Sequence, residues 1–141
     1  MMKKSFATLI KLQKTYVDEQ RQQLSRLLEN LERIENQIAQ LESMKMREQA
    51  AAERDPIARM TYGAFLKAVV AKERVLQKER QTAAMAVRMA QEKLAELFEE
   101  QKRYEIAEEQ RLEEIAKEER RLERIEFDEI GGTRHERKRA G

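Results

Sequence analysis

Apolar residues recur along this chain at alternating steps of four and three residues. This spacing places them on one stripe of a helix that packs against another helix. A first series covers residues 6–45, and nine of its twelve positions are apolar. Its members are Phe6, Ile10, Gln13, Val17, Gln20, Leu24, Leu27, Leu31, Ile34, Ile38, Leu41 and Lys45.

A second series with the same spacing covers residues 62–125, and thirteen of its nineteen positions are apolar. Its members are Tyr62, Leu66, Val69, Glu73, Leu76, Arg80, Ala83, Val87, Ala90, Leu94, Leu97, Gln101, Tyr104, Glu108, Arg111, Ile115, Glu118, Leu122 and Ile125. A stripe sustained over so many heptads predicts left-handed supercoiling of two helices around each other.

The helix-breaking residues divide the chain at two places. Residues 1–55 and 64–130 contain neither Gly nor Pro. Asp55 is suited to cap a helix whose first residue is Pro56, and Gly131-Gly132 is suited to end one. We therefore predict a first helix at about 5–53, a connection at about 54–61, a second helix at about 58–129 and a frayed basic tail at 131–141. Gly63 either extends the connection by a turn or lies inside the second helix.

A short connection between two such helices favours an all-α fold, a two-helix antiparallel coiled-coil hairpin with the second helix longer than the first. We expect it to form one domain over residues 1–141. The alternative is an extended chain that pairs in parallel with a second copy. In the hairpin, the numbers of facing residues sum to roughly 107–111, which places Lys45 near Tyr62 or Leu66. The same register places Ile34 near Leu76 and Phe6 near Tyr104.

The first helix has then ended near Tyr104, while the second continues for about 25 residues, or about 38 Å. Two interpretations of this projecting segment remain open. Pairs such as Glu113 with Lys117 support a solvated single helix, whereas the branched apolar residues favour docking on a partner or on a second copy. These apolar residues are Ile106, Leu112, Ile115, Leu122, Ile125, Phe127 and Ile130.

Composition argues against an enzyme. The chain has no cysteine, one histidine (His135) and only 5% aromatic residues. Disulfides, thiolate zinc sites and cysteine nucleophiles are therefore excluded, and we expect no catalytic, cofactor-binding or metal-binding residues. No apolar stretch approaches the roughly 18 residues of a membrane span. We expect a cytoplasmic protein without membrane insertion.

Charge is arranged in blocks. Residues 99–130 carry 13 acidic and 7 basic groups, whereas residues 131–141 carry 4 basic groups and 1 acidic group. Without a continuous basic stripe, this pattern favours protein partners over nucleic acid. The paired glutamates, such as Glu113-Glu114, fit a solvated helix face better than a shielded catalytic pair. Methionines near the connection, including Met44, Met46 and Met60, fit either packing or a binding patch.

Three segments carry a family resemblance. They are LIKLQKTYVDEQRQQLSRLLENLERIE (9–35), TYGAFLKAV (61–69) and RRLERIEFDEI (120–130). Together they resemble the flagellar type III export chaperones of the FliJ family, most closely the alphaproteobacterial members. The resemblance covers nearly the whole chain.

The resemblance implies a small antiparallel coiled coil shaped like the central stalk of rotary ATPases. Such proteins work at the cytoplasmic face of the flagellar export apparatus, at the inner membrane. The end with both termini enters the ring of the export ATPase, close to its regulator. The other end approaches the cytoplasmic domain of the export gate, and the protein also escorts chaperones of late substrates.

Mapped onto this sequence, the resemblance implies two partner-binding ends. The ATPase end comprises Phe6, Ile10, Tyr104, Leu112, Ile115, Leu122 and Ile125. The gate end comprises Leu41, Met44, Tyr62, Phe65, Val69 and Leu76. The alternative function is that of a self-associating structural scaffold or spacer without an ATPase partner, and the sequence leaves open whether a flagellar or an injectisome system is served.

Overall fold

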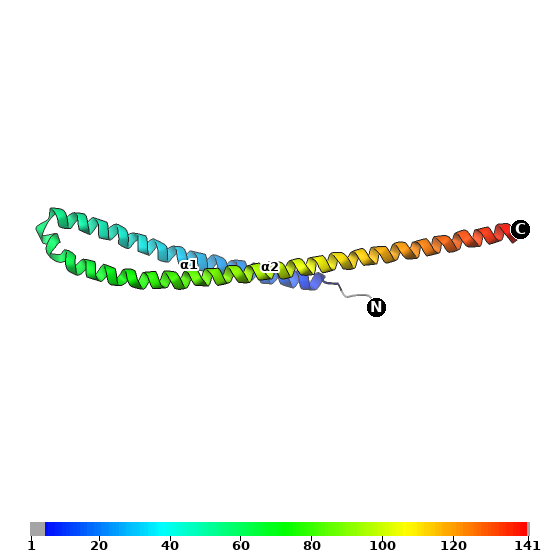
Figure 1. Ribbon diagram of the computed structural model, residues 1–141, viewed down its shortest axis with the longest axis horizontal. Helices are drawn as coiled ribbons and strands as arrows, with labels where there is room; N and C mark the ends of the chain where they lie inside the picture. The colour runs from blue at the N-terminus through cyan, green and yellow to red at the C-terminus, as the bar shows by residue number, and fades with distance from the viewer. Residues whose placement is uncertain (1–4, 141) are drawn as a thin grey trace. The chain divides into compact units, whose positions relative to one another are not determined.

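The structure, a computed structural model, describes residues 5–140, with the side chains of residues 136 and 138–140 excepted. It contains two helices, α1 (Ala7–Arg54) and α2 (Pro56–Ala140), and the described residues form no strand (Figure 1). The all-α fold with a longer second helix is confirmed. The chain divides into two compact units, Tyr16–Glu96 and Met1–Thr15 with Leu97–Gly141, which are described in turn.

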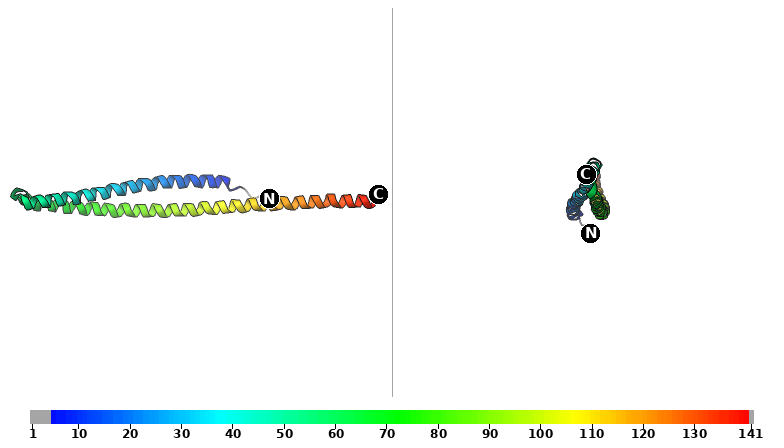
Figure 2. Two further views of the ribbon diagram at one scale, coloured as in Figure 1. Left: turned by 90° about the horizontal axis from the view of Figure 1, so that it is seen from above. Right: turned by 90° about the vertical axis from the view of Figure 1, so that its left-hand side faces the viewer.

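In the unit Tyr16–Glu96, α1 and α2 lie side by side and antiparallel, joined by a tight turn (Figure 2). Its buried side chains form a single seam between the helices, and all but one belong to the two predicted series. The buried apolar residues are Val17, Ile34, Leu41, Ala52, Val69, Leu76, Ala83, Val87 and Ala90. The pairing of apolar stripes is therefore confirmed, and it supplies the hydrophobic stabilisation of this unit.

Polar residues in the seam find partners across it. Gln20 is 9% exposed, and its amide Nε2 donates to the Ala90 carbonyl oxygen at 3.1 Å. The Nζ of Lys45 lies 3.2 Å from Oε1 of Glu73, a partner that the predicted register did not name. The hydrogen bond to Glu73 raises the pKa of Lys45.

The turn is shorter than the predicted connection at 54–61, because α2 begins at Pro56 and runs through Gly63. Asp55 is the one residue between the helices. Its backbone N–H continues the hydrogen bonding of α1, and its carbonyl oxygen accepts from Arg59 N–H at 3.0 Å. Its carboxylate also caps α2 by accepting from Ile57 N–H at 3.0 Å, as expected for Asp before Pro at a helix start.

Arg59 in α2 satisfies the end of α1. Its guanidinium donates to the carbonyl oxygens of Ala52 at 3.0 Å and Glu53 at 3.4 Å. The last carbonyl groups of a helix lack partners within that helix, so a donor from the next element stabilises the end.

The predicted end of the second helix at Gly131-Gly132 is wrong, because α2 continues to Ala140 and no described glycine has a positive φ. The expected frayed tail is helical over residues 131–140, and its last residue, Gly141, lies outside the described residues. Glycine adopts helical angles without strain at a cost of about 1 kcal/mol relative to Ala. The Thr133 hydroxyl also donates across the glycine pair to the Glu129 carbonyl oxygen at 2.8 Å.

In the unit Met1–Thr15 with Leu97–Gly141, the start of α1 packs on α2. The rings of Phe6 and Tyr104 stack with centroids 6.5 Å apart, as the predicted register requires. Gln13 is 4% exposed and its amide Nε2 donates to the Leu97 carbonyl oxygen at 3.1 Å. Beyond this contact region α2 continues alone (Figure 2).

The buried seam makes a prediction about stability. Replacing Ile34, which is 4% exposed, with Ala should lower the free energy of unfolding by about 2–4 kcal/mol because it leaves a cavity. The matched control is Leu28→Ala on the same helix, where the side chain is 44% exposed and the loss should stay below about 1 kcal/mol. Urea unfolding followed by circular dichroism measures both, and equal losses would contradict the seam.

The glycine pair makes a second prediction. A Cβ added at Gly131 or Gly132 meets nothing within 4 Å, so Gly131→Ala and Gly132→Ala should each stabilise the helix by about 1 kcal/mol. Amide hydrogen exchange at residues 133–137 should slow about fivefold per substitution. Gly63→Ala, where space is also open, should leave these amides unchanged. Unaltered exchange in all three variants would argue against a helix across the pair.

Candidate partner-binding surface

The first amides of α1 lie at the surface and need acceptors from outside the helix. Ser5 supplies one, since its hydroxyl oxygen accepts from Ala7 N–H at 3.1 Å. Phe6 begins the helical hydrogen bonding, because its carbonyl oxygen accepts from Ile10 N–H at 2.9 Å. The N–H of Phe6 itself points away from α1, toward α2.

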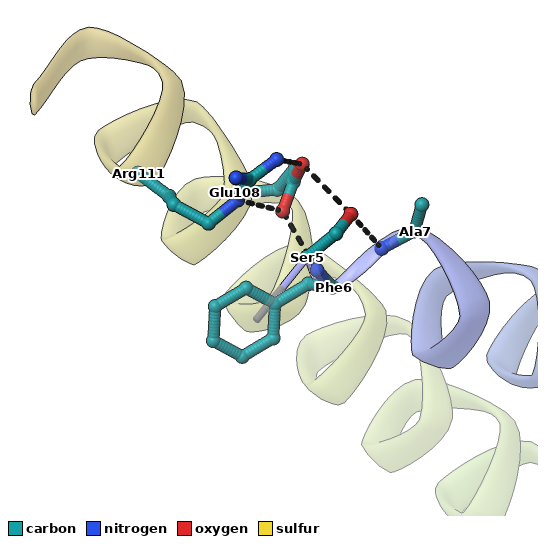
Figure 3. Close-up of polar contacts among 5 residues, drawn as sticks. All are labelled: Ser5, Phe6, Ala7, Glu108 and Arg111. Atoms are coloured by element: carbon teal, nitrogen blue, oxygen red, sulfur yellow. Dashed lines mark hydrogen bonds and ion pairs between the residues drawn. The ribbon is translucent and has the colours of Figure 1, made fainter. Parts of the chain in front are cut away.

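Glu108 of α2 accepts that N–H. Its Oε2 lies 2.8 Å from Phe6 N, and its Oε1 accepts from the Ser5 hydroxyl at 3.3 Å (Figure 3). The same carboxylate receives both arms of the Arg111 guanidinium, at 3.0 Å from Nε and 2.6 Å from Nη2. A negative charge at a helix N-terminus is also favoured by the helix dipole. We call Ser5, Phe6, Glu108 and Arg111 the clasp.

The clasp shifts the titration of its carboxyl group. Hydrogen bonds from Arg111 and from Phe6 N–H lower the pKa of Glu108 from its usual 4.5 to about 2. The same ion pair raises the pKa of Arg111. The clasp was not predicted from the sequence, where its only signal is a Glu and an Arg at two consecutive positions of the apolar series.

Beyond Arg111, the apolar series of α2 continues without α1 opposite it. We call residues 112–130 the arm. Ile115 is half-buried, and the other large apolar residues of the arm are exposed. Their exposed fractions are 53% for Leu112, 52% for Leu122, 43% for Ile125, 77% for Phe127 and 55% for Ile130. Such a row of exposed apolar side chains is characteristic of a surface that a partner covers.

Ion pairs within α2 support the arm as a helix. Lys117 lies 3.9 Å from Glu113, the pair expected from the sequence, and Arg121 lies 2.6 Å from Glu118. The second pair lowers the pKa of Glu118. Exposed pairs of this kind contribute little to stability because solvent screens them, so few interactions stabilise the helix of the arm.

The residues predicted for the ATPase end fall into two groups. Phe6, Ile10 and Tyr104 are half-buried where α1 packs on α2. The other four lie on the arm. The Tyr104 hydroxyl donates to Glu100 at 2.9 Å, and this bond raises the pKa of Tyr104.

The residues predicted for the gate end are also divided. Leu41, Val69 and Leu76 are buried in the seam, at 7%, 5% and 6% exposure. Tyr62 and Phe65 are half-buried, with ring centroids 6.4 Å apart. Met44 is 39% exposed.

Three further apolar residues near the turn are more exposed than any in the predicted gate end. They are Met46 at 70%, Ile57 at 74% and Met60 at 85%. The sequence analysis noted the two methionines without choosing between packing and binding, and did not single out Ile57. Their exposure argues against packing of the turn.

Among residues 5–140, no group of three or more His, Asp or Glu side chains is arranged to hold a metal ion. Nor do the described helices contain a stretch apolar and long enough to span a membrane.

The fold defines the class of protein: a two-helix coiled-coil hairpin of unequal helices, with an exposed apolar arm. Comparison with protein families then identifies the group. The family described as "Flagellar FliJ protein" matches residues 2–140. The chain therefore belongs to the flagellar FliJ family, a non-catalytic component of flagellar protein export, and has an export-related role in motility. Searches of curated proteins and of solved structures gave no match.

The clasp makes a third prediction. Glu108→Gln removes the charge that holds the start of α1, so amide exchange at residues 6–10 should accelerate about fivefold or more, since hydrogen bonds to charged groups are the stronger ones. Glu118→Gln is the matched control. It breaks an ion pair of the same geometry with Arg121 but has no contact with α1.

The pH dependence follows from the same carboxylate. The pKa of Glu108 is lowered from 4.5 to about 2. The stabilisation that its carboxylate gives to the start of α1 is therefore complete above about pH 4.5 and is lost as the pH falls toward 2. Exchange at residues 6–10, corrected for intrinsic rates, should accelerate over that window in the wild type and change less in Glu108→Gln. The same profile in both proteins would contradict the role of Glu108.

Proposed function

We propose that this protein acts in flagellar export as a chaperone escort and as a stalk-like regulator of the export ATPase, linking the ATPase ring to the export gate. It would work in the cytoplasm, peripherally associated with the export apparatus at the inner membrane. Family membership supports the export role, and the exposed apolar stripe of the arm is the observation that carries the ATPase assignment.

The arm has the properties that such a contact requires. It is a single helix, and an export ATPase ring offers a central opening for one. Leu122 and Ile125 lie on the stripe that α1 covers elsewhere in α2 and are 52% and 43% exposed. Burying such side chains contributes about 25 cal/mol per Å². The arm carries eight acidic and four basic residues, so its partner surface should be basic and apolar.

The gate end is proposed at the turn. Met44, Tyr62 and Phe65 supply partly exposed apolar and aromatic surface over a seam containing Leu41, Val69 and Leu76. The exposed Met46, Ile57 and Met60 enlarge this surface. Methionine-rich surfaces repack readily against different partners, which suits contact with the gate domain and with substrate chaperones.

The fourth prediction tests the arm. The purified protein should raise the ATPase rate of its cognate export ATPase, and Leu122→Gln combined with Ile125→Gln should reduce that stimulation at least fivefold at equal concentration. Gln keeps helix propensity close to that of Leu. The matched control is Met85→Gln with Met89→Gln, which removes two apolar side chains of 65% and 64% exposure from α2 outside the arm. Circular dichroism checks the helical content of each variant.

The outcomes separate the candidate functions. Loss of stimulation only in the arm variant supports the proposal. No stimulation by well-folded wild-type protein would contradict it. The second candidate function is that of a self-associating scaffold, which the same exposed stripe also favours. In that case light scattering should show a concentration-dependent dimer, and the arm substitutions should abolish it.

A further inference from the structure

The stripe of α2 that faces the start of α1 is continuous with the stripe of the arm. It runs through Leu97, Gln101 and Tyr104, which are half-buried beneath α1, and on through the clasp to Ile115. The two parts differ in what covers them. The first part is covered by the chain's own N-terminal segment, residues 5–12, which we call the strap. The second part, on the arm, has no cover among the described residues.

The strap is held weakly. None of residues 5–12 is buried, and only Phe6 and Ile10 are even half-buried. Its specific contacts with α2 include the stack of Phe6 on Tyr104 and the hydrogen bonds to Glu108. Segments with few buried apolar side chains open at low free-energy cost. The first fully enclosed side chain along α1 is Gln13, at 4% exposure.

Release of the strap leaves α2 intact. Glu108 keeps its bidentate pair with Arg111, which lies on the same helix, so its charge remains compensated. The Phe6 N–H and the Ser5 hydroxyl return to water. Within this part of α2, the pairs Gln101 with Glu105 and Arg103 with Glu99 also involve no residue of α1.

We propose that the strap is a displaceable cover and that the partner-binding surface of α2 extends beneath it. In the bound state the strap leaves α2, and the partner that covers the arm also covers Leu97, Gln101 and Tyr104. The clasp is then an autoinhibitory contact, with Glu108 as the residue that positions the closed strap. This inference rests on the proposed function in taking the export ATPase ring as the partner. The covered stripe is continuous with the stripe of the arm, so one occupant can cover both.

The decisive experiment locks the strap. The protein contains no cysteine, so Phe6→Cys with Tyr104→Cys creates the only two thiols, at positions whose native rings stack at 6.5 Å. A short bis-maleimide, which adds one cysteine thiol at each end, joins them within one chain. Mass spectrometry confirms the single intramolecular link, and circular dichroism confirms that helicity is kept.

ATPase stimulation is then compared between the linked and unlinked forms of this same variant. We expect the linked form to stimulate at least fivefold less than the unlinked form at equal concentration. Equal stimulation by the two forms would overturn the inference. A failure of the proposed function is distinguishable, because wild-type protein would then give no stimulation at all.

A second pair of variants tests the opposite direction. Glu108→Gln weakens the closed strap, so half-maximal stimulation should occur at about half the wild-type concentration or lower. The control Glu99→Gln removes a 72%-exposed carboxylate that pairs with Arg103, away from the strap and the arm, and should behave as wild type. Hydrogen exchange of residues 5–12 in the complex provides the independent readout. Acceleration on binding supports displacement, whereas protection of the strap would overturn it.

Discussion

The narrowness of the helix–helix seam is the constraint on which the rest of this structure depends. A two-helix hairpin has no compact core, and each helix buries only the residues of one stripe. In the unit Tyr16–Glu96, that stripe supplies all the large buried apolar side chains. Stability therefore accumulates layer by layer along the seam, and any part of α2 without an opposing layer is left with its apolar side chains in water.

Polar residues in the seam specify the register in which α1 packs on α2. Gln13 and Gln20 each donate across the seam to a backbone carbonyl, and Lys45 meets Glu73. A slip of α1 by one turn would break the hydrogen bonds of Gln13 and Gln20 and separate Lys45 from Glu73. These polar contacts therefore favour one register of α1 on α2.

The apolar series and the short connection at Asp55-Pro56 together predicted the two helices, their antiparallel packing and the contact of Phe6 with Tyr104. Heptad spacing determines which side chains face inward, and a short connection determines which residues face each other. The apolar series was also enough to find the exposed stripe through Leu122 and Ile125. It was not enough to find the end of α2, since glycine permits a helix as readily as it ends one. The clasp was beyond sequence reasoning, because it joins Phe6 N–H to a carboxylate 102 residues away.

Side chains of α2 cap both ends of α1. Glu108 accepts from the first free amide of α1, and Arg59 donates to two of its last carbonyl groups. The number of residues between Arg59 and Glu108 on α2 therefore has to match the length of α1. A heptad inserted into α1 alone would push one end past its cap, whereas a heptad inserted into both helices would preserve both caps. Length variation among proteins built on this plan should accordingly arise as paired insertions, one on each side of the Asp55 turn.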